Sequence, residues 1–578
     1  MANFELNGLV FTSETESKLK REEIEHTQNG EIDEYRLRLE FDGEIMPKPY
    51  RITWEIDQVD MMCFWSSKSS LQHNLTPEWC MRTADSKTAS GMPIAVVYNK
   101  SNQNRVSVAL SDPSTPAAIS VGVVEENAKL RIRVELFSKA TAKMSDYEVV
   151  IRTDKRAITV AEAIESARDW WTELGYKLAY VPSGARDPLY SAWYSFHQRT
   201  IPDEIVAECK IAKEYGMDTL IVDDGWQTDD NSRGYGYCGD WKICKNKIPD
   251  MKDFVDRIHA LGMKFMIWFS VPFVGFWSEN YKRFEGKYLY TNHNMNASIL
   301  DPRFKETRDF LVDTYVSYVK EYGWDGLKLD FIDSFRLTDE SSTDYDKMDC
   351  ISVEEGVSRL LSEISDTLKA INPEFLIEFR QSYVGPVVAQ YGNMLRATDC
   401  PNDAILNRVH TLHVRLTSKN VPVHSDMLMW SKRDTNESVA YQLLAVMFSV
   451  PQISIKFDDI TDEHKAILKS FLSFWREHRD TLLDGKLETF GIDANFTSAK
   501  ATGENECVCV QYQSNISRVS DIPTYIFNST GEDGLYLELE NDMKYEIYDI
   551  FGNRYESGSL SHGVSKLNVR NCESVKLF

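Results

Sequence analysis

A lysine and an aspartate lie two residues apart in the segment 323–333, on a stretch that reads as a short buried strand. Side chains two residues apart point to the same face of a strand, so Lys328 and Asp330 are expected to lie side by side. A neighbouring cation keeps a carboxylate ionised at neutral pH. An ionised, positioned carboxylate can act as a nucleophile, a base or a metal ligand, and the alternative is a buried structural ion pair.

The central part of the chain alternates short apolar runs with helical patterns, which indicates parallel strands joined by crossover helices. Eight strands are expected, at residues 192–196, 219–223, 264–269, 326–330, 375–379, 394–398, 421–425 and 452–457. Helices are expected at 202–215, 251–261, 305–322, 353–370, 439–448 and 462–478. Eight such units fit a (β/α)8 TIM barrel, which typically takes about 250 residues.

The flanking regions show a different pattern, in which apolar and polar residues alternate with period two. This alternation predicts antiparallel strands. We therefore expect a multidomain α/β plus β protein, with an N-terminal β-sandwich over residues 1–165, the barrel over 166–484 and a small antiparallel β domain over 485–578.

Functional residues of a barrel lie at the carboxyl ends of its strands. Acids follow expected strands 2, 4, 6 and 7, with tryptophans between them, which is unlike a purely structural pattern. The strand-end residues are Asp223, Asp224 and Trp226, then Trp268, Lys328 with Asp330, Glu378 with Arg380, Arg396 with Asp399 and Asp403, and His424 with Asp426. Two carboxylates across a barrel mouth suit glycoside hydrolysis, because one can attack the anomeric carbon while the other protonates the leaving oxygen.

Composition narrows the function classes. The net charge of -24 disfavours a nucleic-acid partner, whose phosphates would be repelled. No apolar run reaches the roughly 18 residues that span a bilayer, and no signal-peptide pattern is present, so no membrane partner is expected. Ten scattered cysteines favour free thiols and a cytoplasmic location, although a chain stripped of a signal peptide would look the same. The sequence leaves open whether the chain forms a homo-oligomer.

Several segments between residues 190 and 430 resemble glycoside hydrolase family 36, the α-galactosidase (melibiase) family, which shares a clan with family 27. The matching segments are Asp223-Asp224-Gly225-Trp226-Gln227, Gly239-Asp240-Trp241, 259–269 with Ile267-Trp268-Phe269, Leu300-Asp301-Pro302, Lys328-Leu329-Asp330 and Arg396-Ala397-Thr398-Asp399 with Asp403. The family is built from a β-sandwich, a barrel and a C-terminal β domain, in agreement with the expected domains.

The resemblance implies a role for each matching residue. Asp330 would be the nucleophile and Asp399 the acid/base, while Asp223 and Asp224 would bind galactose hydroxyls. Lys328, Arg396 and Trp268 would line the sugar subsite, with Trp226 and Trp241 as walls. The family retains anomeric configuration and needs no metal or nicotinamide, so no cofactor is expected.

The chain departs from the family pattern in three places. The acid/base segment 398–404 is one residue longer than usual, which leaves Asp403 as a competing acid/base and a candidate substrate-binding residue. The loop 268–273 lacks the two glutamates common after strand 3, near the entrance. The Gly/Ser-rich loop common after strand 5 is replaced by 378–382, and Glu378 receives no role.

The function expected from this resemblance is that of a retaining exo-α-galactosidase acting on a small oligosaccharide or glycoconjugate with a terminal α-linked galactose. Alternatives are an α-N-acetylgalactosaminidase, a galactosyl transferase of the same chemistry, a metal-dependent barrel enzyme using Asp330, Glu378 and Asp399, or an inactive sugar-binding module, against which the intact carboxylate pair argues. Double displacement requires Asp330 and Asp399 about 5–5.5 Å apart.

Overall fold

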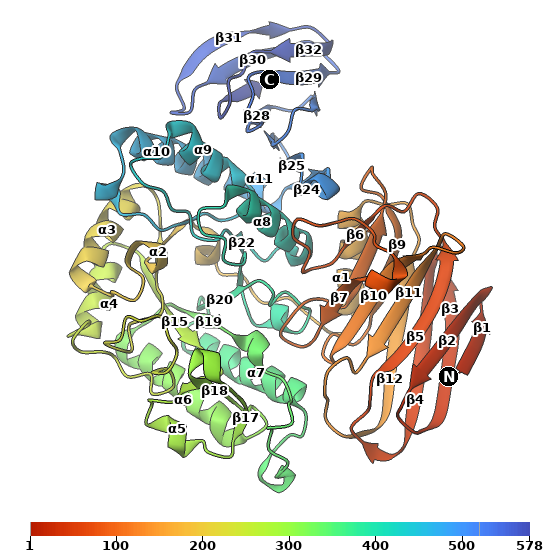
Figure 1. Cartoon of the computed structure of the whole chain (residues 1–578). Coiled ribbons are helices and arrows are strands. Elements are labelled where there is room, and N and C mark those ends of the chain that lie inside the picture. Colours follow the sequence, from red (N-terminus) through yellow and green to blue (C-terminus); the bar gives the residue numbers. More distant parts are fainter. Residues whose placement is uncertain (1, 520) are drawn as a thin grey trace.

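The computed structural model describes residues 2–519 and 521–578, and Figure 1 shows a barrel between two β domains. The N-terminal domain packs two antiparallel six-stranded sheets. The first sheet contains, in order, β1 (Ala2–Leu6), β2 (Leu9–Thr15), β5 (Tyr50–Asp57), β11 (Lys129–Leu136), β10 (Ala117–Val124) and β7 (Arg82–Ser86). The second contains β3 (Leu19–Asn29), β4 (Ile32–Ile45), β12 (Met144–Asp154), β9 (Asn104–Leu110), β8 (Ile94–Tyr98) and β6 (Cys63–Trp65). The predicted sandwich is confirmed.

The sandwich core follows directly from the period-two alternation. Along β11 every second residue is buried, namely Leu130, Ile132, Val134 and Leu136. Because successive side chains of a strand point to opposite faces, such a strand buries one face and exposes the other to solvent.

The central domain is a parallel eight-stranded sheet in the order β22-β21-β20-β19-β15-β14-β13-β23. The strands are β13 (Leu189–Ser191), β14 (Thr219–Val222), β15 (Lys264–Ser270), β19 (Gly326–Asp330), β20 (Leu376–Arg380), β21 (Met394–Arg396), β22 (Val423–His424) and β23 (Gln452–Ile453). Neighbours in space follow the chain order, β23 pairs with β13, and a parallel bridge between His424 and Val450 lies where the two ends of the sheet meet. The predicted (β/α)8 barrel is therefore confirmed.

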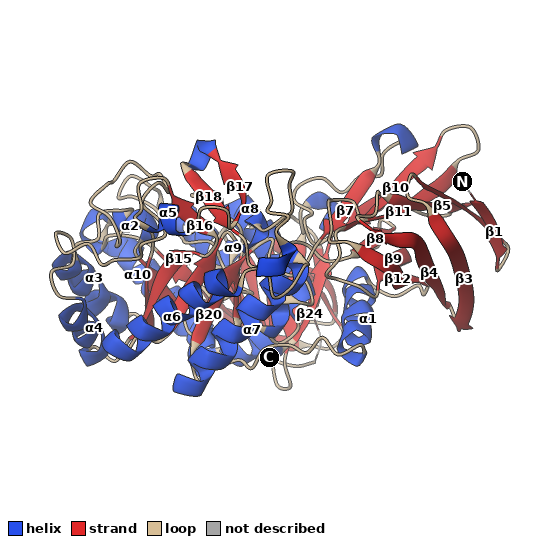
Figure 2. Cartoon of the chain, turned by 90° about the horizontal axis from the view of Figure 1, so that it is seen from below, coloured by secondary structure: helices blue, strands red, loops and turns tan. Residues whose placement is uncertain are grey.

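Helices follow most strands and cover the outside of the barrel (Figure 2). They are α3 (Pro202–Glu214), α4 (Met251–Ala260), α6 (Lys305–Tyr322), α7 (Val353–Ile371), α8 (Ala404–Ser418), α9 (Asn436–Ala445), α10 (Asp462–Glu477) and α11 (Arg479–Asp484), with α1 (Val160–Glu173) preceding the barrel. Local signals set their ends: Pro202 occupies the first turn of α3, and α6 ends at Gly323 in a left-handed conformation. Between β20 and β21 only a 3-10 turn, Val388–Gln390, is present.

The first barrel strand was predicted wrongly at residues 192–196. The strand is β13, and α2 (Trp193–Phe196) follows it as a single helical turn. The physical reason is a tertiary contact: the Ser454 hydroxyl oxygen accepts hydrogen bonds from the backbone N–H groups of Tyr194 and Ser195, at 2.9 and 3.1 Å, which satisfies the start of the turn. Apolar composition alone cannot distinguish such a turn from a buried strand.

A small antiparallel sheet is inserted between β15 and α6. Its order is β16 (Phe273–Gly275), β18 (Ala297–Leu300), β17 (Tyr288–Asn292), and α5 (Asn280–Arg283) lies within it. Because the insertion leaves the barrel from the end of β15, it stands at the carboxyl-terminal end of the barrel strands (Figure 2).

The C-terminal domain contains two sheets. The larger has the order β24 (Lys486–Phe490), β25 (Ser498–Thr502), β26 (Cys507–Gln511), β28 (Thr524–Asn528), β33 (Ser574–Leu577), β30 (Met543–Tyr548), β31 (Arg554–Leu560). The smaller has the order β27 (Ile516–Val519), β29 (Leu535–Leu539), β32 (Gly563–Leu567). Most pairs are antiparallel as predicted, but β26–β28 and β27–β29 are parallel, because a crossover rather than a hairpin joins each pair.

Two further features bear on the sequence analysis. All ten cysteines are free thiols, as expected. In the described part of the chain no helix combines the length and apolar character that a membrane crossing needs.

Asp325, which precedes β19, is expected to stabilise the barrel without taking part in chemistry. Its carboxylate accepts the backbone N–H of Phe265 at 2.8 Å and lies 2.8 Å from His259 Nε2. Asp325→Ala removes both contacts and should lower the free energy of unfolding by about 1–3 kcal/mol, measured by urea denaturation. Unchanged stability in the variant would contradict this assignment.

Candidate active site

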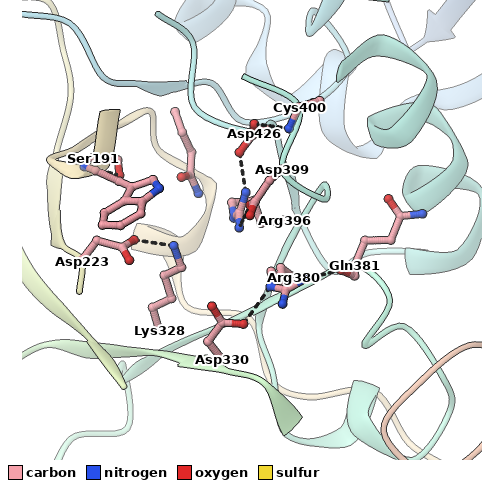
Figure 3. A network of polar contacts seen from close by, with 12 residues as sticks. Ser191, Asp223, Lys328, Asp330, Arg380, Gln381, Arg396, Asp399, Cys400 and Asp426 are labelled. Atoms are coloured by element: carbon pink, nitrogen blue, oxygen red, sulfur yellow. Dashed lines mark hydrogen bonds and ion pairs between the residues drawn. The ribbon is translucent and has the colours of Figure 1, made fainter. Parts of the chain in front are cut away.

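Asp330 lies at the carboxyl end of β19, where its carboxylate pairs with Arg380 (Figure 3). Oδ1 accepts hydrogen bonds from Arg380 Nε at 2.7 Å, from the Tyr383 hydroxyl at 3.0 Å and from the backbone N–H of Phe331 at 2.7 Å. Oδ2 accepts one from Trp268 Nε1 at 3.1 Å. Three donors therefore fix one oxygen, while the other keeps a lone pair for a further partner.

The charges around Asp330 keep it ionised. Burial alone would raise the pKa of this carboxyl, but Arg380 and Lys328 outweigh burial and hold its pKa below the usual range. The side chain is 11% exposed, so an ionised carboxylate still reaches the barrel mouth.

Lys328 stands between several acids. Its ammonium group forms an ion pair with Asp223, and Glu378 and Asp330 also lie close enough to raise its pKa against the effect of burial. The strand register explains this, because Lys328 pairs with Trp268 on one side and with Glu378 on the other. The lysine is thus a buried charge that links the ends of β14, β19 and β20.

Asp224 is held by two amide groups. Gln198 Nε2 donates to Oδ2 at 2.6 Å, and Gln227 Nε2 donates to Oδ1 at 2.7 Å. Burial dominates, with the charge of Asp223 adding to it, and raises the pKa of Asp224 to about 6. Asp224 therefore titrates near neutrality.

Arg396, at the end of β21, is the second buried cation. Its guanidinium forms ion pairs with Asp426 and with Asp399, the latter at 2.8 Å, and its Nε lies 3.6 Å from Glu378 Oε1. Asp426 also accepts from the backbone N–H of Cys400 at 2.7 Å, and Tyr194 donates to it at 3.0 Å. Asp426, named from the sequence as a residue that follows the seventh strand, therefore belongs to the same group of charges as Arg396.

Asp399 and Asp403 differ in their surroundings. The Asp399 side chain is 59% exposed, and although burial opposes ionisation, Arg396 and Lys328 hold its pKa below the usual range. Asp403 is exposed and caps α8, where its Oδ1 accepts the backbone N–H of Leu406 at 2.9 Å. Of the two, only Asp399 forms an ion pair with a buried cation of the site, Arg396.

The three tryptophans named from the sequence are all buried but have different partners. Trp268 donates to Asp330, whereas Trp226 and Trp241 stack on each other behind it, with 0% and 1% exposure. Trp226 Nε1 donates to the Trp268 carbonyl at 2.9 Å. The structure therefore packs Trp226 and Trp241 against each other and against Trp268.

Sequence reasoning missed two further residues of the site. Tyr383 donates to Asp330, and Tyr235 packs against Trp268 and Phe331 with ring centroids 6.2 and 5.0 Å apart. Both residues belong to loops, where periodicity does not predict which side chains reach the site. Tyr383 follows the end of β20 by three residues, which is a weak signal, whereas Tyr235 lies thirteen residues beyond β14 and gave none.

The metal-binding alternative finds little support in the side-chain arrangement. Each of its three acids already has a partner: Asp330 pairs with Arg380, Asp399 with Arg396, and Glu378 accepts from Gln452 at 2.6 Å. Among the described residues, no group of three or more His, Cys, Asp or Glu side chains is placed to hold a metal ion.

A turn of the sandwich domain holds two loops of the site. This turn, residues 87–91 between β7 and β8, is named the sandwich turn. Lys87 Nζ donates to the carbonyls of Asp333 and Phe335, beyond β19, the latter at 2.7 Å. Gly91 N–H donates to the Ser382 carbonyl at 2.8 Å, beyond β20. The segments that follow Asp330 and Arg380 are therefore tied to another domain.

Comparison with known proteins agrees with this architecture of a barrel between two β domains. A family model described as Melibiase matches residues 186–485, more than half of the chain, so the chain belongs to the melibiase family.

Known relatives match over shorter stretches. α-Galactosidase Mel36A of Lactobacillus acidophilus is 28% identical over 156 residues, which cover 25% of this chain and 20% of that protein. The bifunctional α-galactosidase/sucrose kinase AgaSK of Mediterraneibacter gnavus is 28% identical over 194 residues, covering 32% and 20%. These alignments span about a fifth of the length of either relative.

Solved structures match over most of the chain. A variant of the family 36 α-galactosidase AgaA from Geobacillus stearothermophilus, in complex with raffinose, aligns with a TM-score of 0.65 and 14% identity, covering 99% of this chain and 81% of that one. TtGalA from Thermus thermophilus, in complex with p-nitrophenyl α-D-galactopyranoside, aligns with a TM-score of 0.54 and 15% identity, covering 88% and 98%. At these identities the likeness establishes the fold.

Galactose binding is expected to strengthen as pH rises through about 6, if Asp224 accepts sugar hydroxyls. The pKa of Asp224 is about 6, so the carboxylate is mostly protonated at pH 5 and mostly ionised at pH 7. The dissociation constant for galactose should therefore fall about tenfold over this range, measured by titration calorimetry. Asp224→Asn should bind weakly at both values, and a variant that kept the full pH dependence would exclude Asp224 as its source.

Proposed function

We propose that the protein is a retaining exo-α-galactosidase that hydrolyses terminal α-linked galactose through a covalent galactosyl-enzyme intermediate. The observation that carries this proposal is the contrast between two strand-end carboxylates that share one cationic cluster. Asp330 is ionised and held by four donors, whereas Asp399 is largely exposed and held by Arg396. A fixed nucleophile and a mobile proton carrier are the two groups that retaining hydrolysis requires.

In the first step, Asp330 attacks the anomeric carbon from the β face. The bond between that carbon and the glycosidic oxygen breaks, and Asp399 gives its proton to the leaving oxygen. Oδ2 is the better placed attacking atom, because Oδ1 already accepts three hydrogen bonds. In the second step, Asp399 takes a proton from water, and the resulting hydroxide displaces Asp330, so galactose leaves with its original anomeric configuration.

Asp399 has to carry a proton in the first step, although Arg396 favours its ionised form. Arg396 also pairs with Asp426 and lies near Glu378, so it keeps two buried partners when Asp399 turns towards a substrate. Release from Arg396 removes the main attraction that lowers the pKa of Asp399. Protonation of Asp399 is therefore coupled to substrate entry.

The proposed substrates are small oligosaccharides or glycoconjugates that end in α-linked galactose. This choice rests on the family and on the solved relatives, whose structures contain raffinose, stachyose and an aryl α-galactoside. Asp223 and Asp224 are the residues proposed to bind the galactose hydroxyls, with Lys328 beside them.

Asp330→Gly should abolish hydrolysis and should regain turnover in the presence of azide. Azide fits the space of the deleted carboxylate and attacks from the same face, so the product should be β-galactosyl azide. Proton NMR of the product formed from p-nitrophenyl α-galactoside identifies it. Hydrolysis at the wild-type rate by this variant would rule out Asp330 as the nucleophile.

Asp399→Ala and Asp403→Ala should separate the two candidates for the acid/base. Loss of general acid catalysis costs about 10²–10⁴-fold, so Asp399→Ala should lower kcat/KM for raffinose by about that factor. The decrease should be much smaller for p-nitrophenyl α-galactoside, whose leaving group needs no proton.

Asp403→Ala is the matched control for this comparison. It should affect both substrates equally and should cost about 1 kcal/mol of stability through the lost helix cap. The opposite pattern, with selective loss on raffinose in Asp403→Ala, would assign the acid/base role to Asp403.

A further inference from the structure

Two exposed aromatic side chains lie side by side, apart from Lys328, Arg396 and the carboxylates around them. Tyr237 is 41% exposed and Trp277 is 56% exposed, and their ring centroids are 4.9 Å apart. Exposure of large aromatic rings to water is unfavourable, so an exposed pair in contact points to a ligand or partner. We call these two residues the aromatic pair.

The chain topology places the aromatic pair at the mouth of the barrel. Tyr237 lies in the connection from β14 to α4, and Trp277 follows β16 in the insertion after β15. Both connections leave from the carboxyl ends of their strands. Since β15 is the neighbour of β19, the aromatic pair stands at the same end of the barrel as Asp330.

The backbone beneath the aromatic pair is built for close approach. Trp277 N–H donates to the Gly236 carbonyl at 2.9 Å, and Gly275 N–H donates to the Cys238 carbonyl at 2.8 Å. A Cβ atom on Gly275 would lie 2.1 Å from the Gly236 oxygen, and one on Gly236 would lie 2.3 Å from the Trp277 ring. Only glycine fits at position 275, where the added atom would meet backbone, so the two segments cross tightly beneath the rings.

Tyr235 connects the aromatic pair to the nucleophile. It packs on Trp268, which donates to Asp330, and it lies two residues before Tyr237. Two residues span at most about 7 Å of chain. The chain segment that carries Tyr237 therefore begins at a ring packed beside the residue that holds the nucleophile. Trp277 lies in the same insertion after β15, four residues beyond the loop 268–273 that departs from the family pattern.

We propose that Tyr237 and Trp277 form a subsite for the saccharide attached to the terminal galactose. The aromatic faces pack against the apolar C–H face of a sugar ring, while the ring's hydroxyl groups stay in water. This inference rests on the proposed function. The insertion after β15 would then favour substrates that carry a second or third sugar unit over those with a small aglycone. A second copy of this chain is the alternative occupant of such a surface, and the light-scattering measurement below would detect it.

Trp277→Ala and Tyr237→Ala should raise KM for raffinose about fivefold, within the range expected for one lost aromatic contact. The KM for methyl α-galactoside should change by less than twofold, because its methyl aglycone is too small to pack on the rings. Trp277→Phe should retain most of the affinity for raffinose. Trp79→Ala removes an exposed tryptophan (73%) of the sandwich domain and should leave both KM values unchanged.

A binding measurement separates this inference from the proposed function. Raffinose is titrated into Asp330→Asn and into the double variant Asp330→Asn/Trp277→Ala, with weaker binding expected only in the second. Wild-type protein that releases no galactose from either substrate would refute the proposed function, while the titration still tests the subsite. Equal effects on both substrates, unchanged raffinose binding, or a change of molar mass in light scattering with Trp277→Ala would overturn the inference.

Discussion

A buried guanidinium, that of Arg396, sets the structure of the site. It is 1% exposed, and it faces carboxylates from three places: Glu378 on β20, Asp399 after β21 and Asp426 after β22. A charge taken out of water costs several kcal/mol unless partners surround it. Three consecutive strand ends are therefore drawn together around one cation, in the same way that Lys328 gathers acids from β14, β19 and β20.

The number of partners accounts for the different behaviour of the two carboxylates. Asp330 accepts hydrogen bonds on both oxygens and cannot turn without breaking several of them. Asp399 is held by Arg396 and is otherwise largely exposed, so a turn breaks a single ion pair. Similar chemical groups acquire different roles because one is enclosed and the other is not, a common arrangement for paired acids in catalysis.

The sequence carries enough information to predict most barrel strands, most helices and the acids at strand ends, because each follows from local periodicity and from the geometry of a barrel. Lys328 and Asp330 are the clearest case, since their spacing places them on one face. Tyr235 and Tyr383 lie beyond such reasoning, because loop paths depend on contacts with other segments. The burial of a side chain is equally hard to predict from a motif. Trp226 and Trp241 both lie in matching segments, but tertiary packing decides whether each ring faces a cavity or a core.

The sandwich turn has a consequence for how this protein can change over time. Lys87 and Gly91 hold the segments beyond β19 and β20, and Gly385 approaches Gly91 so closely that a Cβ atom would lie 2.6 Å from its carbonyl oxygen. Substitutions at these contacts are therefore constrained from both sides, because a larger residue at Gly91 or Gly385 has to be accommodated by the sandwich and by the barrel at once.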